Sequence, residues 1–139
     1  RRLSKELNVL GYVDFLGKIT DREMIKQYLA QADIGIEPAP LNDANKYSTF
    51  IKVMEYMAAG KPVVAFDLVE TKYSVDGAAL LVPPRDNEGF AHAIEKLLDA
   101  PRLREELGKA GSERIEKEMN WKKAASNLTE AYAALFLKA

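Results

Sequence analysis

The sequence predicts an α/β fold in which a parallel sheet is covered by helices on both faces. Short apolar runs alternate with amphipathic helical patterns, and the runs contain few polar side chains. Strands that are apolar throughout are typical of parallel sheets, because both faces of such a sheet are buried. With 139 residues, the chain is long enough to form one domain with its own core.

Four strands are expected where the apolar runs occur. The predicted strands are residues 12–16, 33–37, 63–66 and 79–82. Glycine or proline directly follows the first, second and fourth of them, as expected where a strand ends. No repeat or low-complexity stretch interrupts this order.

Helices are expected between these strands. Thr20 and Glu23 have the spacing of a capping box that starts the first helix. The second helix is expected to begin at Ser48 as its N-cap and to end at Gly60, which can adopt the left-handed conformation after a helix.

After the last strand the sequence is helical only. Side chains at the helical period predict a core face made of Phe90, Ala93, Ile94, Leu97 and Leu98. Pro101 is expected to begin a further helix that Gly108 and Gly111 weaken, and a last helix runs from about Trp121.

The helix from Ser48 contains a carboxylate that packing alone would not choose. Nearly all of its other side chains are apolar, so we expect the helix to be largely buried. Ser48, Lys52 and Glu55 share one stripe of it. An unpaired buried charge costs several kcal/mol, so Glu55 needs a partner or a ligand. Lys52 could pair with Glu55 or approach a phosphate.

The position of this helix indicates what the ligand would be. In parallel sheets ligands bind beyond the carboxyl ends of the strands. Free amides and the positive end of the helix dipole near Ser48 would bind phosphate there. Glu55, two turns further on, would suit a ring that carries hydroxyl groups. The pattern predicts a nucleoside diphosphate, and Glu37 at a strand end is a further candidate for hydroxyl contact.

Composition excludes several kinds of site. There is no cysteine and only one histidine, so we expect no thiolate or histidine metal site. We also expect no cofactor beside the nucleoside diphosphate ligand. The net charge of −1 gives no preference for nucleic acid. No apolar run approaches the ~20 residues that span a bilayer, and no signal peptide opens the chain. We therefore expect a cytoplasmic location.

Residues 54–67 read MEYMAAGKPVVAFD, with VDFLG before them and AALLVPPRD after them. In this order the segments resemble the C-terminal, donor-binding half of a retaining GT-B glycosyltransferase of family 4. The resemblance covers roughly residues 10–120. It implies a Rossmann-like domain that binds a nucleotide sugar of the UDP or GDP type, while an N-terminal domain binds the acceptor.

The resemblance also implies roles for individual residues. Glu55 corresponds to the glutamate that binds the ribose hydroxyls, and Ser48 and Thr49 correspond to the helix start that faces the diphosphate and the sugar. The backbone that borders the base corresponds to Gly17, Lys18 and Ile19. No catalytic residue can be named in this way.

Two departures from the family pattern affect the donor site. Tyr47 stands eight residues before Glu55, where the family often has a glutamate that contacts the donor sugar. Asp43 or Asn45 would have to make that contact instead. The Gly-Gly pair that usually follows the VVA strand is also missing, and Glu70 in this region is the candidate for part of its role.

The front of the family's domain has no counterpart before Arg1. We expect residues 1–139 to form a single nucleotide-sugar-binding domain that lacks its first strands and the N-terminal acceptor domain. The chain alone would then be inactive, and unpaired sheet edges would favour self-association. Any peripheral membrane contact would belong to the missing half.

For the full-length enzyme, the resemblance implies transfer of a hexosyl group from a nucleoside-diphosphate sugar to an acceptor hydroxyl, with retention. Such enzymes serve polysaccharide or glycoconjugate biosynthesis. Two alternatives stay open: a non-catalytic, flavodoxin-like module for phosphate binding or protein interaction, and a GT-B-type sugar-nucleotide epimerase.

Overall fold

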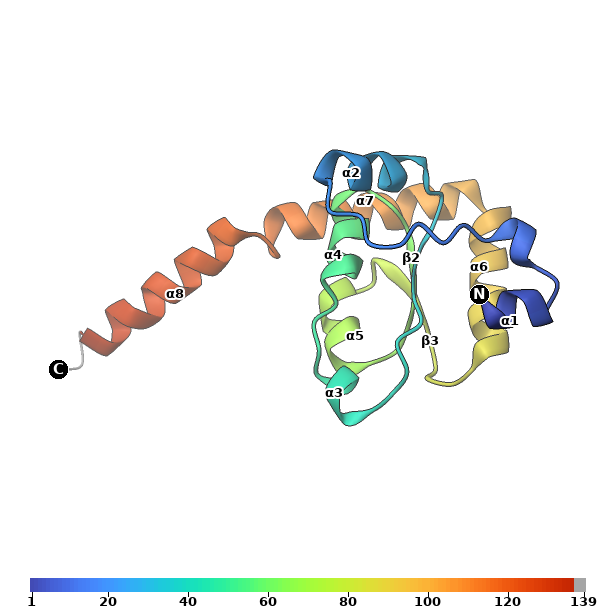
Figure 1. The fold of residues 1–139 in the computed structure, drawn as a ribbon. Coiled ribbons are helices and arrows are strands. Elements are labelled where there is room, and N and C mark those ends of the chain that lie inside the picture. The colour runs from blue at the N-terminus through green and yellow to red at the C-terminus, as the bar shows by residue number, and fades with distance from the viewer. Residues whose placement is uncertain (137–139) are drawn as a thin grey trace.

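The computed structural model describes residues 1–136 and confirms the α/β fold (Figure 1). Its elements in chain order are α1 (Arg2–Glu6), the 3-10 helix η1 (Leu10–Tyr12), α2 (Arg22–Gln31), β1 (Gly35–Glu37), α3 (Asp43–Lys46), α4 (Ile51–Ala58), β2 (Val63–Phe66), α5 (Val69–Val75), β3 (Ala79–Val82), α6 (Asn87–Asp99), α7 (Pro101–Lys117) and α8 (Trp121–Phe136).

Three of the predicted strands form one parallel sheet in the order β1-β2-β3. Gly35 of β1 lies opposite Val63 of β2, and Glu37 lies opposite Ala65. Strand β2 is fully buried in the middle of the sheet and pairs along its whole length with β3. Since the strands are parallel, their carboxyl ends meet at one edge.

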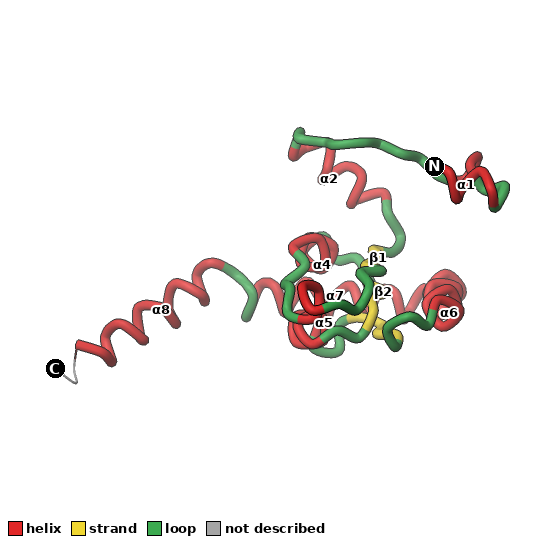
Figure 2. Tube along the Cα trace, turned by 60° about the horizontal axis from the view of Figure 1, so that its bottom comes forward, coloured by secondary structure: helices red, strands yellow, loops and turns green. Residues whose placement is uncertain are grey.

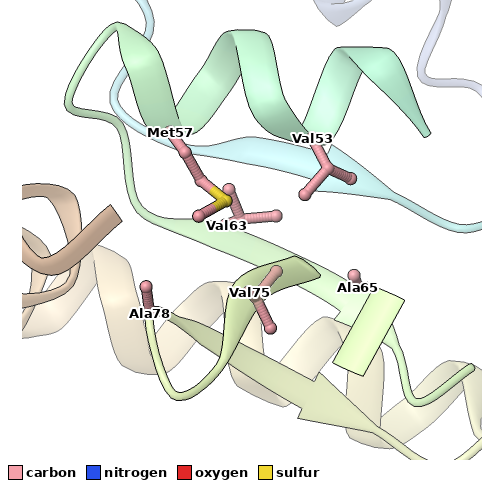
Figure 3. Close-up of a cluster of buried hydrophobic side chains, with 6 residues drawn as sticks. All are labelled: Val53, Met57, Val63, Ala65, Val75 and Ala78. Atoms are coloured by element: carbon pink, nitrogen blue, oxygen red, sulfur yellow. The ribbon is translucent and has the colours of Figure 1, made fainter. Parts of the chain in front are cut away.

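Helices cover both faces of this sheet, as predicted. Side chains of β2 alternate between two cores. Val63 and Ala65 belong to the core under α4 and α5 (Figure 3), whose other buried members are Val53, Met57, Val75 and Ala78. Val64 and Phe66 belong to the core under α6, with Leu68, Val82, Phe90 and Leu97. Figure 2 shows the strands between α6 and the pair formed by α4 and α5.

The predicted strand at residues 12–16 is wrong. Tyr12 ends η1 and is 91% exposed, and the residues after it form an irregular, exposed segment. A strand needs a neighbour that completes its backbone hydrogen bonds. Within residues 1–136 this segment pairs with no strand of the sheet. Its apolar pattern alone could not supply that partner.

The predicted cap of the first long helix is displaced by one residue. The carboxylate of Asp21, and not the hydroxyl of Thr20, accepts hydrogen bonds from the amides of Glu23 (2.8 Å) and Met24 (3.3 Å). Asp21 is as good an N-cap as threonine or better, so two adjacent cap residues competed and the aspartate occupies the position.

Ser48 is not the N-cap of α4, which begins only after Phe50. The hydroxyl of Ser48 donates instead to the carbonyl of Ala44 and thereby closes the short helix α3. A serine side chain that is engaged with the preceding turn is not available to cap the next helix. Ser48 and Thr49 therefore lie in the connection between the two helices.

The end of α4 at Gly60 is confirmed. Gly60 has a φ of +67°, which glycine adopts without strain. The amide of Gly60 donates to the carbonyl of Met57, and the amide of Lys61 donates to the carbonyl of Tyr56, each at 2.9 Å. This pair of bonds is a Schellman motif, and it turns the chain into β2.

α7 is continuous through Gly108 and Gly111, so their low helix propensity does not interrupt it. Both are buried where α7 packs against the end of α4. A Cβ atom on Gly108 would overlap the carbonyl oxygen of Gly60, whereas one on Gly111 would lie 3.2 Å from Cγ of Met57. The glycines therefore allow a close approach between two helices.

Helix α8 extends away from the rest of the chain (Figure 1), and none of its residues is buried. Trp121 is 81% exposed. Within residues 1–136, no helix combines the length and the apolar character that crossing a membrane would require.

Candidate functional site

The carboxyl edge of the sheet gathers several of the predicted site residues. Lys52 is in the first turn of α4 and Glu70 in the first turn of α5, and both helices start at this edge. Ser48 and Thr49 lie just before α4 and are partly or fully exposed. These four residues therefore belong to one region of the fold.

A carboxylate that sequence reasoning left in a minor role lies beneath this region. Glu37 is the last residue of β1, and only 2% of it is exposed. Its Oε2 lies 2.8 Å from Nζ of Lys52. Lys52 is thus paired with Glu37, and an ion pair between Lys52 and Glu55 is not formed. A glutamate at the end of a short apolar strand was the signal in the sequence.

The prediction that α4 is largely buried is wrong, and Glu55 is exposed. Only Val53 and Met57 of α4 are buried, because the helix packs on the sheet with one stripe. Within residues 1–136, Glu55 takes part in none of the ion pairs. The need of a buried carboxylate for a ligand therefore does not apply to Glu55. A role for Glu55 has to be inferred from the residues around it.

Glu55 lies on the wall of an open groove between α2 and α4, with a volume of about 590 Å³. Ala58 and Ala59 line the groove beside it, and their small side chains leave the helix surface accessible. The opposite wall comes from the start and the body of α2: Thr20, Arg22, Ile25, Lys26 and Leu29. The groove thus combines one carboxylate with two basic side chains and apolar surface.

The residues expected to border the base lie next to this groove in the chain. Gly17, Lys18 and Ile19 directly precede Thr20, although none of the three lines the groove itself. Gly17 has a φ of +70°, so the chain turns there in a conformation that favours glycine. Glu55 is one turn from Lys52, so α4 connects the groove with the carboxyl edge of the sheet.

Tyr56, the neighbour of Glu55 in α4, is partly buried against the core. Its ring packs against Gly35 of β1, where a Cβ atom would collide with it. Partial burial raises the pKa of the Tyr56 phenol above its usual value of 10.0, and the neighbouring Glu55 carboxylate raises it further. Both effects disfavour the phenolate in the folded protein.

This shift predicts a loss of stability in alkali. Below pH 10 the neutral phenol is present in both states, so the contribution of Tyr56 is complete. Above pH 10 the unfolded chain ionises first, and stability falls until the pH passes the folded pKa. In an ultraviolet titration of phenolate, Tyr56→Phe should remove a component that ionises at higher pH than the other tyrosines. Glu55→Gln should lower the pKa of the Tyr56 phenol. Glu95→Gln on α6 should change neither. Six tyrosines that titrate as one class in the folded state would contradict this expectation.

The part of the chain that the structure describes contains no group of three or more histidine, aspartate or glutamate side chains that could hold a metal ion.

Comparison with known proteins identifies the family. Residues 1–100 match the family model described as glycosyl transferases group 1. The chain belongs to this family. Its membership and its fold confirm the resemblance to a GT-B glycosyltransferase, with a Rossmann-like parallel sheet.

Two glycosyltransferases match almost the whole chain. This chain is 34% identical over 133 residues to a D-inositol 3-phosphate glycosyltransferase of Corynebacterium aurimucosum. The aligned region covers 94% of this chain and 30% of that protein. The chain is also 34% identical over 132 residues to a phosphatidyl-myo-inositol mannosyltransferase of Mycobacterium leprae, covering 94% of this chain and 32% of that protein.

A solved structure agrees with these relatives. Sucrose-phosphate synthase from Thermosynechococcus elongatus superposes with a TM-score of 0.79 and 31% sequence identity, over 99% of this chain and 34% of that one. The chain therefore spans about a third of the length of the relatives that it matches.

Proposed function

We propose that this chain is the donor-binding part of a GT-B glycosyltransferase of family 4, and that residues 1–139 form a single domain that holds a nucleoside-diphosphate sugar. The observation that carries this proposal is the Glu55 carboxylate, exposed on the wall of the groove between α2 and α4. A carboxylate without an ion-pair partner can accept hydrogen bonds from two vicinal hydroxyl groups of a ribose. Membership of the group 1 family supports this role.

The groove orients the rest of the donor. With the ribose at Glu55, the base lies toward the mouth of the groove, beside Gly17, Lys18 and Ile19. The diphosphate lies toward the first turn of α4. Because α4 begins after Phe50, the amides without an intrahelical partner are those that follow it, at Ile51 and Lys52.

The other predicted contacts belong to the sugar end of the donor. Ser48 and Thr49 stand before α4, and Glu70 stands at the start of α5, so all three belong to the carboxyl edge of the sheet. We assign them to the transferred sugar. Lys52, with its ammonium group at the same edge, is assigned to the phosphates.

In the full-length enzyme we propose transfer of a hexosyl group to an acceptor hydroxyl with retention, without a metal or another cofactor. Basic side chains and helix amides stabilise the leaving diphosphate. The relative from Mycobacterium leprae is named a mannosyltransferase, which supports transfer of a hexosyl group. We propose a donor of the UDP or GDP type. The acceptor groups, and any contact with a membrane surface, come from the remaining two thirds. We place the enzyme in the cytoplasm, in polysaccharide or glycoconjugate biosynthesis.

The family match favours this function over the alternatives. A flavodoxin-like module without activity would not explain similarity to glycosyltransferases over 94% of the chain. A GT-B-type epimerase would share the architecture, but the two bacterial relatives described above are named a glycosyltransferase and a mannosyltransferase, which favours transfer. Self-association through the sheet edges is a separate proposal, and light scattering that finds a monomer at high concentration would refute it.

The test of the function is a calorimetric titration of the chain with UDP, GDP and ADP. We expect one of these nucleotides to bind and Glu55→Ala to weaken it at least tenfold, about 1.4 kcal/mol. The 2′-deoxy form of that nucleotide should bind more weakly than the parent to the wild type and equally to Glu55→Ala.

Glu95→Ala is the matched control, because Glu95 is an exposed glutamate on α6 outside the groove. It should leave the affinity unchanged. A nucleotide that binds Glu55→Ala as tightly as the wild type would refute the role of Glu55.

A further inference from the structure

The pair formed by Glu37 and Lys52 is asymmetric in its exposure. Glu37 is 2% exposed, whereas the side chain of Lys52 is 50% exposed. The carboxylate therefore lies below the surface and the ammonium group reaches solvent at the carboxyl edge of the sheet. Nζ of Lys52 also lies 6.0 Å from the ring centroid of Phe50, the residue before α4. Two contacts thus restrain a side chain that is otherwise flexible.

Glu37 is not explained by the stability of the fold. It occupies an inward position of β1 opposite Ala65, beside a core of apolar side chains. Its Oε2 has no hydrogen bond within the described residues, although the Lys52 ammonium is close. Replacing a buried ion pair of this kind by apolar side chains is often neutral or stabilising. The carboxylate therefore has a use that an apolar residue could not serve.

We propose that Glu37 is a positioning residue that holds the ammonium group of Lys52 at the carboxyl edge of the sheet, where it binds a pyrophosphate group. Glu37 does not touch the ligand, because its carboxylate is covered. The exposed part of the Lys52 side chain is accessible to the anion. Lys52 lies in the first turn of α4, where the helix dipole also favours negative charge. This inference rests on the proposed function and specifies how its phosphate end is bound.

A second ion pair at the same edge is a control provided by the chain. Lys72 lies 3.7 Å from Asp67, and both side chains are well exposed, at 69% and 40%. An exposed pair of this geometry contributes little and does not hold its lysine in one place. If a lysine at this edge needed no buried partner to bind the anion, substitution of Asp67 and substitution of Glu37 would affect anion binding equally.

The experiment follows inorganic pyrophosphate binding by NMR of the lysine side-chain amino groups, with the Lys52 signal assigned by its loss in Lys52→Met. Pyrophosphate should shift this signal in the wild type. Glu37→Leu and Glu37→Gln should each weaken pyrophosphate binding by about tenfold. Asp67→Asn should weaken it by less than about twofold.

A double-mutant cycle separates positioning from a general effect on the fold. If Glu37 acts through Lys52, Glu37→Leu should cause no further loss of affinity in the Lys52→Met background. Thermal unfolding of Glu37→Leu and Glu37→Gln shows which variant is as stable as the wild type. The pyrophosphate affinity of that variant is then compared with the affinity of the wild type. An unshifted Lys52 signal overturns the proposal, and so does an equal loss with and without Lys52.

The outcome is distinguishable from that of the Glu55 test. Glu55→Ala should leave pyrophosphate binding unchanged, because pyrophosphate has no ribose. Glu37→Leu should in turn leave the preference for the ribonucleotide over its 2′-deoxy form unchanged. Failure of one test with success of the other would show which end of the donor site is wrongly assigned.

Discussion

Leu97→Ala is expected to lower the free energy of unfolding by about 2–5 kcal/mol. Leu97 has no exposed surface and belongs to the core between the sheet and α6. Truncation leaves a cavity beside β2, where neighbours such as Val64 are held by strand pairing on both sides and cannot move to fill it. Urea denaturation, followed by far-ultraviolet circular dichroism, measures the change.

The control is Leu98→Ala, at the next position of the same helix. Truncation of Leu98 removes the same atoms and changes the helix propensity equally, but Leu98 is 54% exposed. We expect an effect of about 0.5 kcal/mol or less. Equal losses for the two variants would show that α6 does not pack on the sheet with the face described above. The helical period of the sequence predicted both leucines on the core face, and only the packing separated them.

Gly108→Ala is expected to destabilise the fold by about 1–3 kcal/mol, although alanine is the better helix former. The added methyl group would overlap the carbonyl oxygen of Gly60, and that backbone is held by the Schellman motif at the end of α4. α7 would therefore have to move away from α4. Chemical denaturation of the variant measures the loss.

Gly111→Ala is its matched control, one turn further along α7. Its methyl group would lie 3.2 Å from Cγ, 3.3 Å from Cβ and 3.4 Å from Cα of Met57, close contacts that a shift of a few tenths of an ångström relieves. Alanine gains about 1 kcal/mol of helix propensity, so we expect a result near zero or a small stabilisation. If both variants were stabilised, the close approach of α7 to α4 at Gly108 would be refuted.

Local sequence signals identified the central part of the fold well. The apolar runs at β2 and β3 predicted the strands with their observed bounds, because buried parallel strands tolerate few polar residues. Gly60 ended α4 as predicted, because its φ requires glycine or a similar residue. Where a signal depended on one residue, the boundary shifted: the N-cap lies one position after Thr20 and two positions after Ser48.

The candidate site was only partly predictable. The motif around Glu55 predicted a helix that ends at Gly60, as observed for α4. The reason given for Glu55, burial in an apolar helix, was wrong because α4 touches the sheet with one stripe. The pairing of Lys52 with Glu37 joins residues from two elements, and no spacing along the chain encodes it. The groove between α2 and α4 likewise exists only through their packing.

The amino-acid sequence by itself determined that this group 1 glycosyltransferase chain forms a parallel sheet covered on both faces, since that follows from the periodicity and from the residues at turns. The tertiary structure decided which side chains meet. It left residues 12–16 without a strand partner, exposed Glu55 beside α2, and placed Glu37 under Lys52. The physical reason is that burial and charge pairing depend on neighbours distant in the chain, whereas propensity depends on neighbours in sequence.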